Sequence, residues 1–243
     1  MMAWLRSSAY MVFLTVTVIP YAFACLLCAP LPQPWRYRFT VGWPRLAVWG
    51  AKVLVGIRWE VKGWENLPAG PAVVLAKHQS AWETLWLPAH MPKQLVFVYK
   101  RELHKVPFFG WGLALLDMIA IDRSDRRGAM DQVFKLGSER LAKNRWPILF
   151  PEGTRVAPGQ VGRYQAGGAR LAVQAGVPVI PIAHNAGEVW PRNAFIKRPG
   201  TITVSIGPPI DSTGLSATAL NQRVQDWIEA EMRQLSPHRY AAS

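Results

Sequence analysis

Cysteine and acidic side chains are scarce in this chain of 243 residues, which has two cysteines and 15 Asp and Glu residues. Two cysteines exclude a disulfide-rich scaffold and a zinc site with several cysteine ligands. Charged residues make up 18% of the chain, below the usual ~25%, whereas 50% are apolar, which excludes intrinsic disorder. A single uncharged stretch is long enough to span a bilayer, which argues against a polytopic membrane protein. The length suits one domain, or one domain with an appendage.

Basic residues outnumber acidic ones by 28 to 15, and the net charge is +13. Six basic residues precede the first acidic one, Glu60, and six of the 12 tryptophans lie in the first 64 residues. Arg and Lys interleaved with Trp are typical of the lipid headgroup zone, where indole is stable and anionic lipid attracts cations. Nucleic acid is the rival partner for a basic chain. Because the basic residues are scattered among apolar ones, we predict membrane lipids as partners and no nucleic acid.

Residues 7–35 carry no charge, and the apolar stretch 7–29 would form a helix of ~34 Å, enough for a ~30 Å hydrocarbon core. Pro20 lies in its middle, so a kinked span and a shallow re-entrant hairpin are both open. Ala-Phe-Ala at 22–24 resembles a signal-peptide cleavage site, but the apolar region exceeds the usual ~7–15 residues and basic residues follow closely. We therefore expect a retained anchor that holds the protein on the cytoplasmic face of the inner (cell) membrane.

Residues 1–56 are predicted to form this membrane-anchoring helical segment, in which 42–56 make a second helix that is interfacial or partly buried. Over residues 57–243, short apolar runs alternate with helical stretches, which indicates an α/β domain with a mixed, largely parallel sheet flanked by helices. The predicted strands are 57–61, 72–76, 95–99, 118–121, 147–150, 177–183 and 201–206. The predicted helices are 81–89, 108–116, 126–143, 168–174 and 216–235.

His78 and Glu83 lie directly after a predicted strand, and two interpretations of this pair are open. In the structural one, Ser80 and Glu83 form a capping box, S-x-x-E, that opens the next helix. In the functional one, the chain folds back so that the Glu83 carboxylate orients the His78 ring. A neutral imidazole could then accept the proton of a substrate hydroxyl, and the carboxylate would stabilise the imidazolium. The other histidines, among them His184, lack a carboxylate at matching spacing and are expected in surface or core roles.

The hexapeptide F-P-E-G-T-R at residues 150–155 follows another predicted strand, at the end of the sheet where α/β proteins bind ligands. Gly153 allows a positive φ or close approach of a ligand. Arg155 offers a bidentate fork for phosphate. The alternative is a turn with a solvated ion pair.

Basic residues also follow two other predicted strands: Lys100 and Arg101 after one, and Arg123 after the next. Charges at strand ends usually face solvent. If these strands are parallel, their carboxyl ends meet at one edge of the sheet, where the basic side chains would suit a phosphate group.

Four sequence blocks, in order, resemble the glycerolipid acyltransferase family over residues 57–210, in particular its lysophosphatidic acid acyltransferase branch. The family block N-H-x-S-x-x-D resembles K-H-Q-S-A-W-E at 77–83, and F-P-E-G-T-R is identical at 150–155. The block K-x-x-L-x-x-x-P-x-x-G matches from Lys100 or Arg101 and continues to I-D-R at 121–123, and V-P-[IV]-[IV]-P-[IV] matches 177–182. Two positions depart from the family: Glu83 replaces the usual Asp, and Lys77 a common Asn.

The resemblance implies transfer of a fatty acyl group from a thioester to the free hydroxyl of lysophosphatidic acid, giving phosphatidic acid. It implies that His78 is the general base and that Glu83 orients it. The residues implied to bind the acceptor's phosphate and glycerol are Arg155, Glu152, Gly153, Thr154, Arg123, Lys100 and Arg101. The acyl donor would be acyl-CoA or an acyl carrier protein thioester, whose negative charge suits the basic surface. Because a thioester is already activated, we expect no metal and no other cofactor.

Alternatives to this function stay open. The acceptor could be another lysophospholipid or an amino-acid lipid. His78 could instead activate water in a thioesterase or lipid esterase, although the sequence has no G-x-S-x-G elbow. A non-catalytic lipid-binding protein would use the His-Glu pair only as a cap. An acyl chain would need an apolar groove, for which the candidate lining residues are Trp82, Trp86, Phe108, Phe109 and Trp111.

Overall fold

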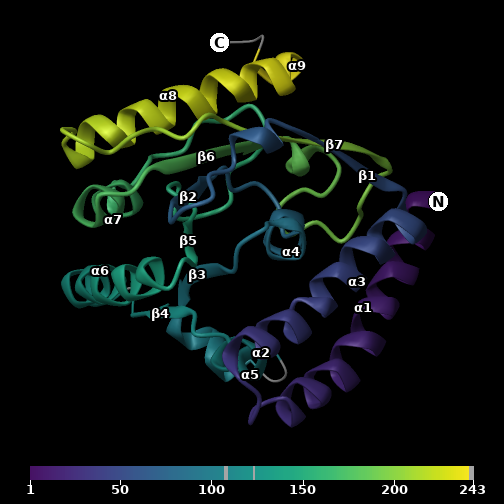
Figure 1. Cartoon of the computed structure of the whole chain (residues 1–243). Coiled ribbons are helices and arrows are strands. Elements are labelled where there is room, and N and C mark those ends of the chain that lie inside the picture. The colour runs from purple at the N-terminus through teal and green to yellow at the C-terminus, as the bar shows by residue number, and fades with distance from the viewer. Residues whose placement is uncertain (107–108, 123, 241–243) are drawn as a thin grey trace.

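A seven-stranded sheet forms the centre of the computed structural model, which describes residues 1–106, 109–122 and 124–240 (Figure 1). Its strands lie in the order β1-β7-β6-β2-β5-β3-β4. The strands are β1 (Ile57–Lys62), β2 (Val73–Ala76), β3 (Leu95–Lys100), β4 (Ile119–Ile121), β5 (Trp146–Leu149), β6 (Val179–His184) and β7 (Gly200–Ile206). Strands β6, β2, β5, β3 and β4 are parallel, whereas β7 is antiparallel to β6 and parallel to β1. The predicted mixed, largely parallel sheet is confirmed.

Helices cover both faces of this sheet (Figure 1). One face carries α6 (Arg126–Ala142), α7 (Gly167–Ala175) and α8 (Ala217–Leu235), and α4 (Trp82–His90) packs on the other. The remaining helices are α1 (Met2–Leu27), α2 (Gln33–Thr40), α3 (Gly42–Gly50), α5 (Phe109–Ala114) and α9 (Pro237–Tyr240). Strand β2 is buried on both faces, as its unbroken V-V-L-A run requires for a central parallel strand.

The alternation of side chains along β2 divides the core into two clusters. Val73 and Leu75 point towards α7 and α8, whereas Val74 and Ala76 pack with the tryptophans of α4. Helix α8 contributes a buried stripe at four-residue steps, which is the pattern of an amphipathic surface helix. The stripe consists of Leu220, Val224, Ile228 and Met232.

Each predicted strand and helix of the α/β body is present with ends within two residues of the expected ones. The N-terminal region departs in two details. The predicted helix 42–56 is α3 followed by a π-helical turn at Ala51–Val55, which ends where Gly56 takes a φ of 88°. Helix α2 was not predicted, because the prolines at 30–34 indicate only the end of the apolar helix. Pro32 precedes α2 and Pro34 lies in its first turn, where a missing N–H costs nothing.

Helix α1 lies along one side of the molecule, and α3 runs back beside it (Figure 1). In the described part of the chain, α1 is the one helix long and apolar enough to cross a membrane. One side of α1 is buried against the protein: Tyr10 is fully buried and its hydroxyl donates to the Ala47 carbonyl at 3.0 Å. Near the start of the helix, the Ser7 Oγ accepts the backbone N–H of Lys197 at 2.8 Å. The opposite side exposes apolar side chains.

Candidate active site

The carboxyl ends of β2 and β5 lie side by side, because these strands pair in parallel with Leu75 opposite Leu149. The same offset places His78, three residues on, beside Glu152. The backbone N–H of His78 donates to Glu152 Oε2 at 2.9 Å, and the Val156 N–H donates to the His78 carbonyl at 2.8 Å. The two sequence blocks that were singled out therefore form one site at the edge of the sheet where α/β proteins bind ligands.

His78 and Glu83 are in direct contact, with 2.8 Å between Nδ1 and Oε1. The same Oε1 accepts the backbone N–H groups of Gln79 at 3.0 Å and Ser80 at 2.9 Å, and Ser80 Oγ accepts the Trp82 N–H at 3.1 Å. One half of the predicted capping box, the hydrogen bond from the Ser80 N–H to Glu83, thus coexists with the His-carboxylate pair. The hydrogen bonds to Glu83 turn the chain before α4, so that His78, which lies just outside the helix, can reach Glu83 in the first turn of α4.

The surroundings of Glu83 favour its ionised form. Burial would raise the pKa of its carboxyl, but the electrostatic interaction with His184 and the hydrogen bonds from His78 and Ser80 hold this pKa below its usual range. A carboxylate only accepts hydrogen bonds, so the proton of a neutral His78 ring lies on Nδ1. That leaves Nε2 as the basic nitrogen. The ring is stacked on Phe150, with 4.0 Å between the centroids, and its side chain is 14% exposed.

His184 is buried and contacts the loop after β2, which carries His78. Its Nδ1 accepts the Ala186 N–H at 3.3 Å, which places the proton on Nε2, and Nε2 donates to the Lys77 carbonyl at 2.8 Å. Burial lowers the pKa of His184, and the interaction with the Glu83 carboxylate opposes this shift. Of the surface or core roles expected for the other histidines, His184 has a core position, but its contact with the residue before His78 was not predicted. Its sequence signal is its place at the end of β6, the strand next to β2.

Glu152 does not reach the surface of the site. Its carboxylate is buried, with Oε1 bound by Lys77 Nζ at 2.7 Å and Oε2 by the His78 N–H. Burial raises the pKa of this carboxyl, and Lys77 opposes that rise. Both oxygens are thus engaged inside the protein, and the direct contact with an acceptor that was expected of Glu152 finds no support in this geometry. The next residues, Gly153 and Thr154, are exposed.

Basic side chains from neighbouring strand ends do meet, in part, at this edge. Strand β3 lies between β4 and β5, all parallel, so Lys100 and Arg155 come from adjacent carboxyl ends, and both line the same cavity as His78. Lys100 also pairs with the exposed Glu102 at 3.1 Å. Arg101 is exposed beside it, and Arg123 lies outside the described residues.

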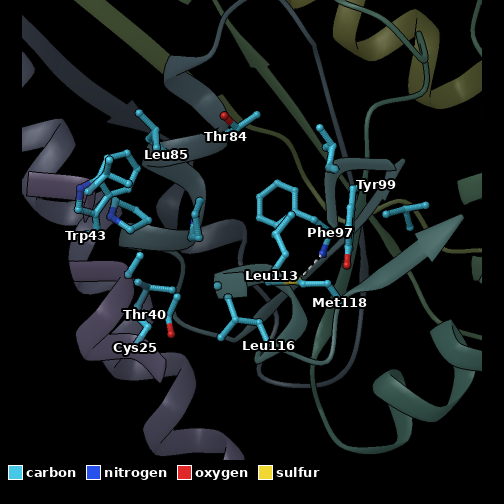
Figure 2. A pocket seen from close by; sticks show the side chains of 18 of the residues that line it. Cys25, Thr40, Trp43, Thr84, Leu85, Phe97, Tyr99, Leu113, Leu116 and Met118 are labelled. Carbon is cyan, nitrogen blue, oxygen red and sulfur yellow. Dashed lines mark hydrogen bonds between the residues drawn. The ribbon is translucent and has the colours of Figure 1, made fainter. Parts of the chain in front are cut away.

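An apolar cavity of about 480 Å³ extends from His78 between the N-terminal helices and the sheet. Figure 2 shows Cys25, Thr40 and Trp43 on one side of this space and Phe97, Tyr99 and Met118 of the sheet on the other. Leu113 and Leu116 lie between them, and Thr84 and Leu85 of α4 also line the space. Its size is within the ~300–1,000 Å³ of ligand pockets. Arg155 and Lys100 add positive charge to the lining.

The aromatic residues proposed for such a groove from the sequence lie mostly elsewhere. Trp82 and Trp86 are buried in the core between α4 and the sheet, and neither lines the cavity. Trp111 is partly exposed, and Phe108 and the side chain of Phe109 lie outside what the structure describes. Among the described residues, no group of three or more His, Cys, Asp and Glu side chains is placed to hold a metal ion.

Comparisons with known proteins identify the family of this chain. Residues 58–185, more than half of the chain, match the family model described as Acyltransferase. The chain is 47% identical over 238 residues to the 1-acyl-sn-glycerol-3-phosphate acyltransferase of Pseudomonas aeruginosa, which covers 96% of this chain and 92% of that protein. The enzyme of the same name from Saccharomyces cerevisiae is 30% identical over 76% of this chain and 63% of its own length.

The fold also recurs in a solved structure. The crystal structure of the 1-acyl-sn-glycerophosphate (LPA) acyltransferase PlsC from Thermotoga maritima matches with a TM-score of 0.80 and 24% sequence identity, over 96% of this chain and 95% of that one. The chain therefore belongs to the acyltransferase family, in the 1-acyl-sn-glycerol-3-phosphate acyltransferase branch that its motifs predict.

Proposed function

We propose that this acyltransferase moves a fatty acyl group from a thioester to the free hydroxyl of lysophosphatidic acid, with His78 as general base. The observation that carries the proposal is the His78–Glu83 contact, in which His78 lines the same apolar cavity as Arg155. The names of the relatives support the same acceptor. The acyl donor is proposed to be acyl-CoA or acyl carrier protein, with no other cofactor.

The chemistry follows from the tautomer of His78. Its Nε2 takes the proton of the acceptor hydroxyl while the oxygen attacks the thioester carbonyl carbon and forms a tetrahedral intermediate. The intermediate collapses, the C–S bond breaks, and the imidazolium returns the proton to the departing sulfur. The Glu83 carboxylate stabilises the imidazolium between these steps. General base catalysis supplies ~10²–10⁴-fold, and an activated thioester requires no covalent enzyme intermediate.

We assign each part of the substrates to the residues whose chemistry fits it. The apolar cavity takes an acyl chain, and Arg155 binds the acceptor phosphate with a bidentate fork. Lys100 and Arg101 add positive charge, exposed Gly153 and Thr154 offer polar contacts beside Arg155, and Arg123 is kept as a sequence-based candidate. Glu152 acts through the backbone of His78 rather than on the acceptor.

The site is proposed to work at a membrane surface, with α1 lying in the headgroup plane. The helix contacts the body near both ends: Ser7 binds Lys197, and the Phe23 ring lies 6.2 Å from that of Trp111. A helix crossing the bilayer in this arrangement would draw charged parts of the body into lipid, which is costly. Its outer face exposes apolar side chains at three- and four-residue steps: Val12, Val16, Ile19 and Phe23. The basic N-terminal region favours the cytoplasmic face of the cell membrane.

Flotation with anionic phosphatidylglycerol vesicles tests this placement. Val16→Glu should reduce the vesicle-bound fraction, because a carboxylate on the apolar face would enter lipid. The matched control is Gln174→Glu, which adds the same charge at an exposed position on α7. Equal flotation of both variants would refute the assignment of this face.

The reaction is tested by release of free thiol from acyl-CoA by detergent-purified protein, with and without lysophosphatidic acid, while the lipid product is followed by mass. Thiol release that requires the acceptor, with phosphatidic acid formed, is the expected result. Release without acceptor would identify a thioesterase. If neither occurs, the same assay with acyl carrier protein as donor and with other lysolipids as acceptor decides between another substrate pair and a protein that only binds lipid.

A further inference from the structure

Lys77 is the residue before His78, and its whole side chain is buried. Its Nζ lies 2.7 Å from Glu152 Oε1, 2.7 Å from Glu229 Oε1 and 3.3 Å from the Gln160 carbonyl. An ammonium group has three donors, and these three acceptors use them all. The contacts join the end of β2 to the loop after β5 and to the middle of α8.

The charges of this cluster depend on Lys77. Glu152 and Glu229 are both buried, and Tyr164 donates its hydroxyl to Glu229 at 2.8 Å. Without the ammonium group, two carboxylates would share a buried space with no cation between them, which disfavours the ionised form of at least one. A protonated Glu152 would lose an acceptor position.

Glu152 connects this cluster to the reacting residue. Its Oε1 is held by Lys77, and its Oε2 accepts the backbone N–H of His78. Adjacent residues of an extended segment point in opposite directions, so Lys77 turns into the core while His78 turns towards the cavity. The cluster therefore acts on the backbone that carries the imidazole.

We propose that Lys77 and Glu229 are positioning residues that hold Glu152, and through it the backbone of His78, in the geometry needed for proton transfer. The proposal rests on the proposed function of His78 as base. A cluster kept only for stability is the alternative. Buried ion pairs are often no more stabilising than apolar side chains of similar volume, so stability alone does not explain why this site uses a lysine.

The test separates stability from positioning with Lys77→Met, Glu229→Gln and the double variant. Lys77→Met keeps the approximate length of the side chain and removes the charge. We expect it to lower the melting temperature and to lower kcat at least about tenfold, since small displacements of reacting groups cost up to ~10²-fold. Adding Glu229→Gln removes the facing carboxylate, so the double variant should regain melting temperature but not kcat.

The controls distinguish this proposal from the proposed function. Lys135→Met makes the same change at an exposed position on α6 and should leave kcat and KM unchanged. If Lys77 acts by positioning, KM for lysophosphatidic acid should stay within about threefold of the unchanged protein's value in all folded Lys77 variants, because Lys77 does not contact substrate. Glu229→Gln alone should lower kcat less than Lys77→Met does, since Lys77 still holds Glu152.

The outcomes are distinct. A folded double variant with kcat near that of the unchanged protein would overturn the positioning role and leave a structural cluster. If Lys77→Met does not fold, the double variant alone decides by the same criterion. Full activity of His78→Ala would overturn the proposed function, and the positioning proposal would fall with it. An inactive His78→Ala with an active double variant would overturn the positioning proposal alone.

Discussion

Replacing Glu83 with Gln removes the negative charge of this side chain but keeps an oxygen atom that accepts hydrogen bonds. Oε1 accepts hydrogen bonds from the His78 ring and from the backbone N–H groups of Gln79 and Ser80. An amide oxygen in the same position can accept all three, so the start of α4 and the tautomer of His78 should persist. The negative charge is lost. The new NH₂ group takes the place of Oε2, a buried atom to which no described residue donates a hydrogen bond.

The expected loss follows from the interaction of this charge with the imidazolium. Hydrogen bonds to charged groups contribute about 1.5–3 kcal/mol, against about 0.5–1.5 kcal/mol for neutral ones. Two unit charges ~4 Å apart at an effective dielectric constant of ~20 interact by about 4 kcal/mol. Glu83 is only 1% exposed, so solvent screens the pair little. We therefore expect the transition state to lose about 3 kcal/mol, or roughly 10²-fold in kcat at ~1.36 kcal/mol per tenfold.

The assay is acceptor-dependent thiol release by Glu83→Gln, with circular dichroism and thermal unfolding as the check on folding. Glu83→Ala is the companion variant, because it also removes the acceptor of two backbone N–H groups and should unfold at a lower temperature. A folded Glu83→Gln protein with kcat within about threefold of the unchanged enzyme would refute the reasoning, since Glu83 would then be a helix cap alone.

Three further predictions concern other parts of the site. Arg155→Ala should raise KM for lysophosphatidic acid about 10- to 100-fold, because one hydrogen-bonding charged group is lost. KM for the thioester should change little. An equal effect on both KM values would show that Arg155 does not bind the acceptor phosphate. Leu113→Trp should fill part of the cavity and shift preference towards shorter acyl chains in a competition assay, and an unchanged preference would place the acyl chain elsewhere. The pKa of His184 is lowered in the folded state, so the unfolded chain takes up the proton first and the free energy of unfolding should fall as pH drops below about 6.5. His184→Gln keeps a donor for the Lys77 carbonyl but cannot titrate, and urea unfolding should show a weaker dependence on pH; the same slope in both proteins would assign the dependence to other groups.

Local sequence patterns predicted most of the fold because each element of the body carries its own signal. The apolar run at β2 and the four-residue stripe of α8 each indicate one element without reference to the rest of the chain. Helix α2 was missed because prolines both end and begin helices, so Pro32 and Pro34 do not by themselves indicate a new helix. The site at the ends of β2 and β5 could be predicted because parallel strands bring their carboxyl ends together.

What could not be predicted depends on contacts between distant residues. Lys77 and Glu229 are 152 positions apart, and no local pattern indicates that α8 contacts the loop after β2. Glu152 was assigned to the acceptor because sequence does not show which way a side chain in a turn points. The cavity is lined in part by α1, through residues such as Cys25. That contact depends on how the N-terminal helices pack on the body, so aromatic residues at 82, 86, 108, 109 and 111 were proposed for the groove instead.

The central claim is that His78 removes the proton of the acceptor hydroxyl, and the most direct measurement is the rate of phosphatidic acid formation by His78→Ala. The matched control is His238→Ala, because His238 is an exposed histidine far along the chain from the site. We expect His78→Ala to stay folded and to lose ~10²–10⁴-fold in rate, while His238→Ala keeps the rate of the unchanged enzyme. A folded His78→Ala protein whose rate lies within about tenfold of the control would show that His78 is not the general base.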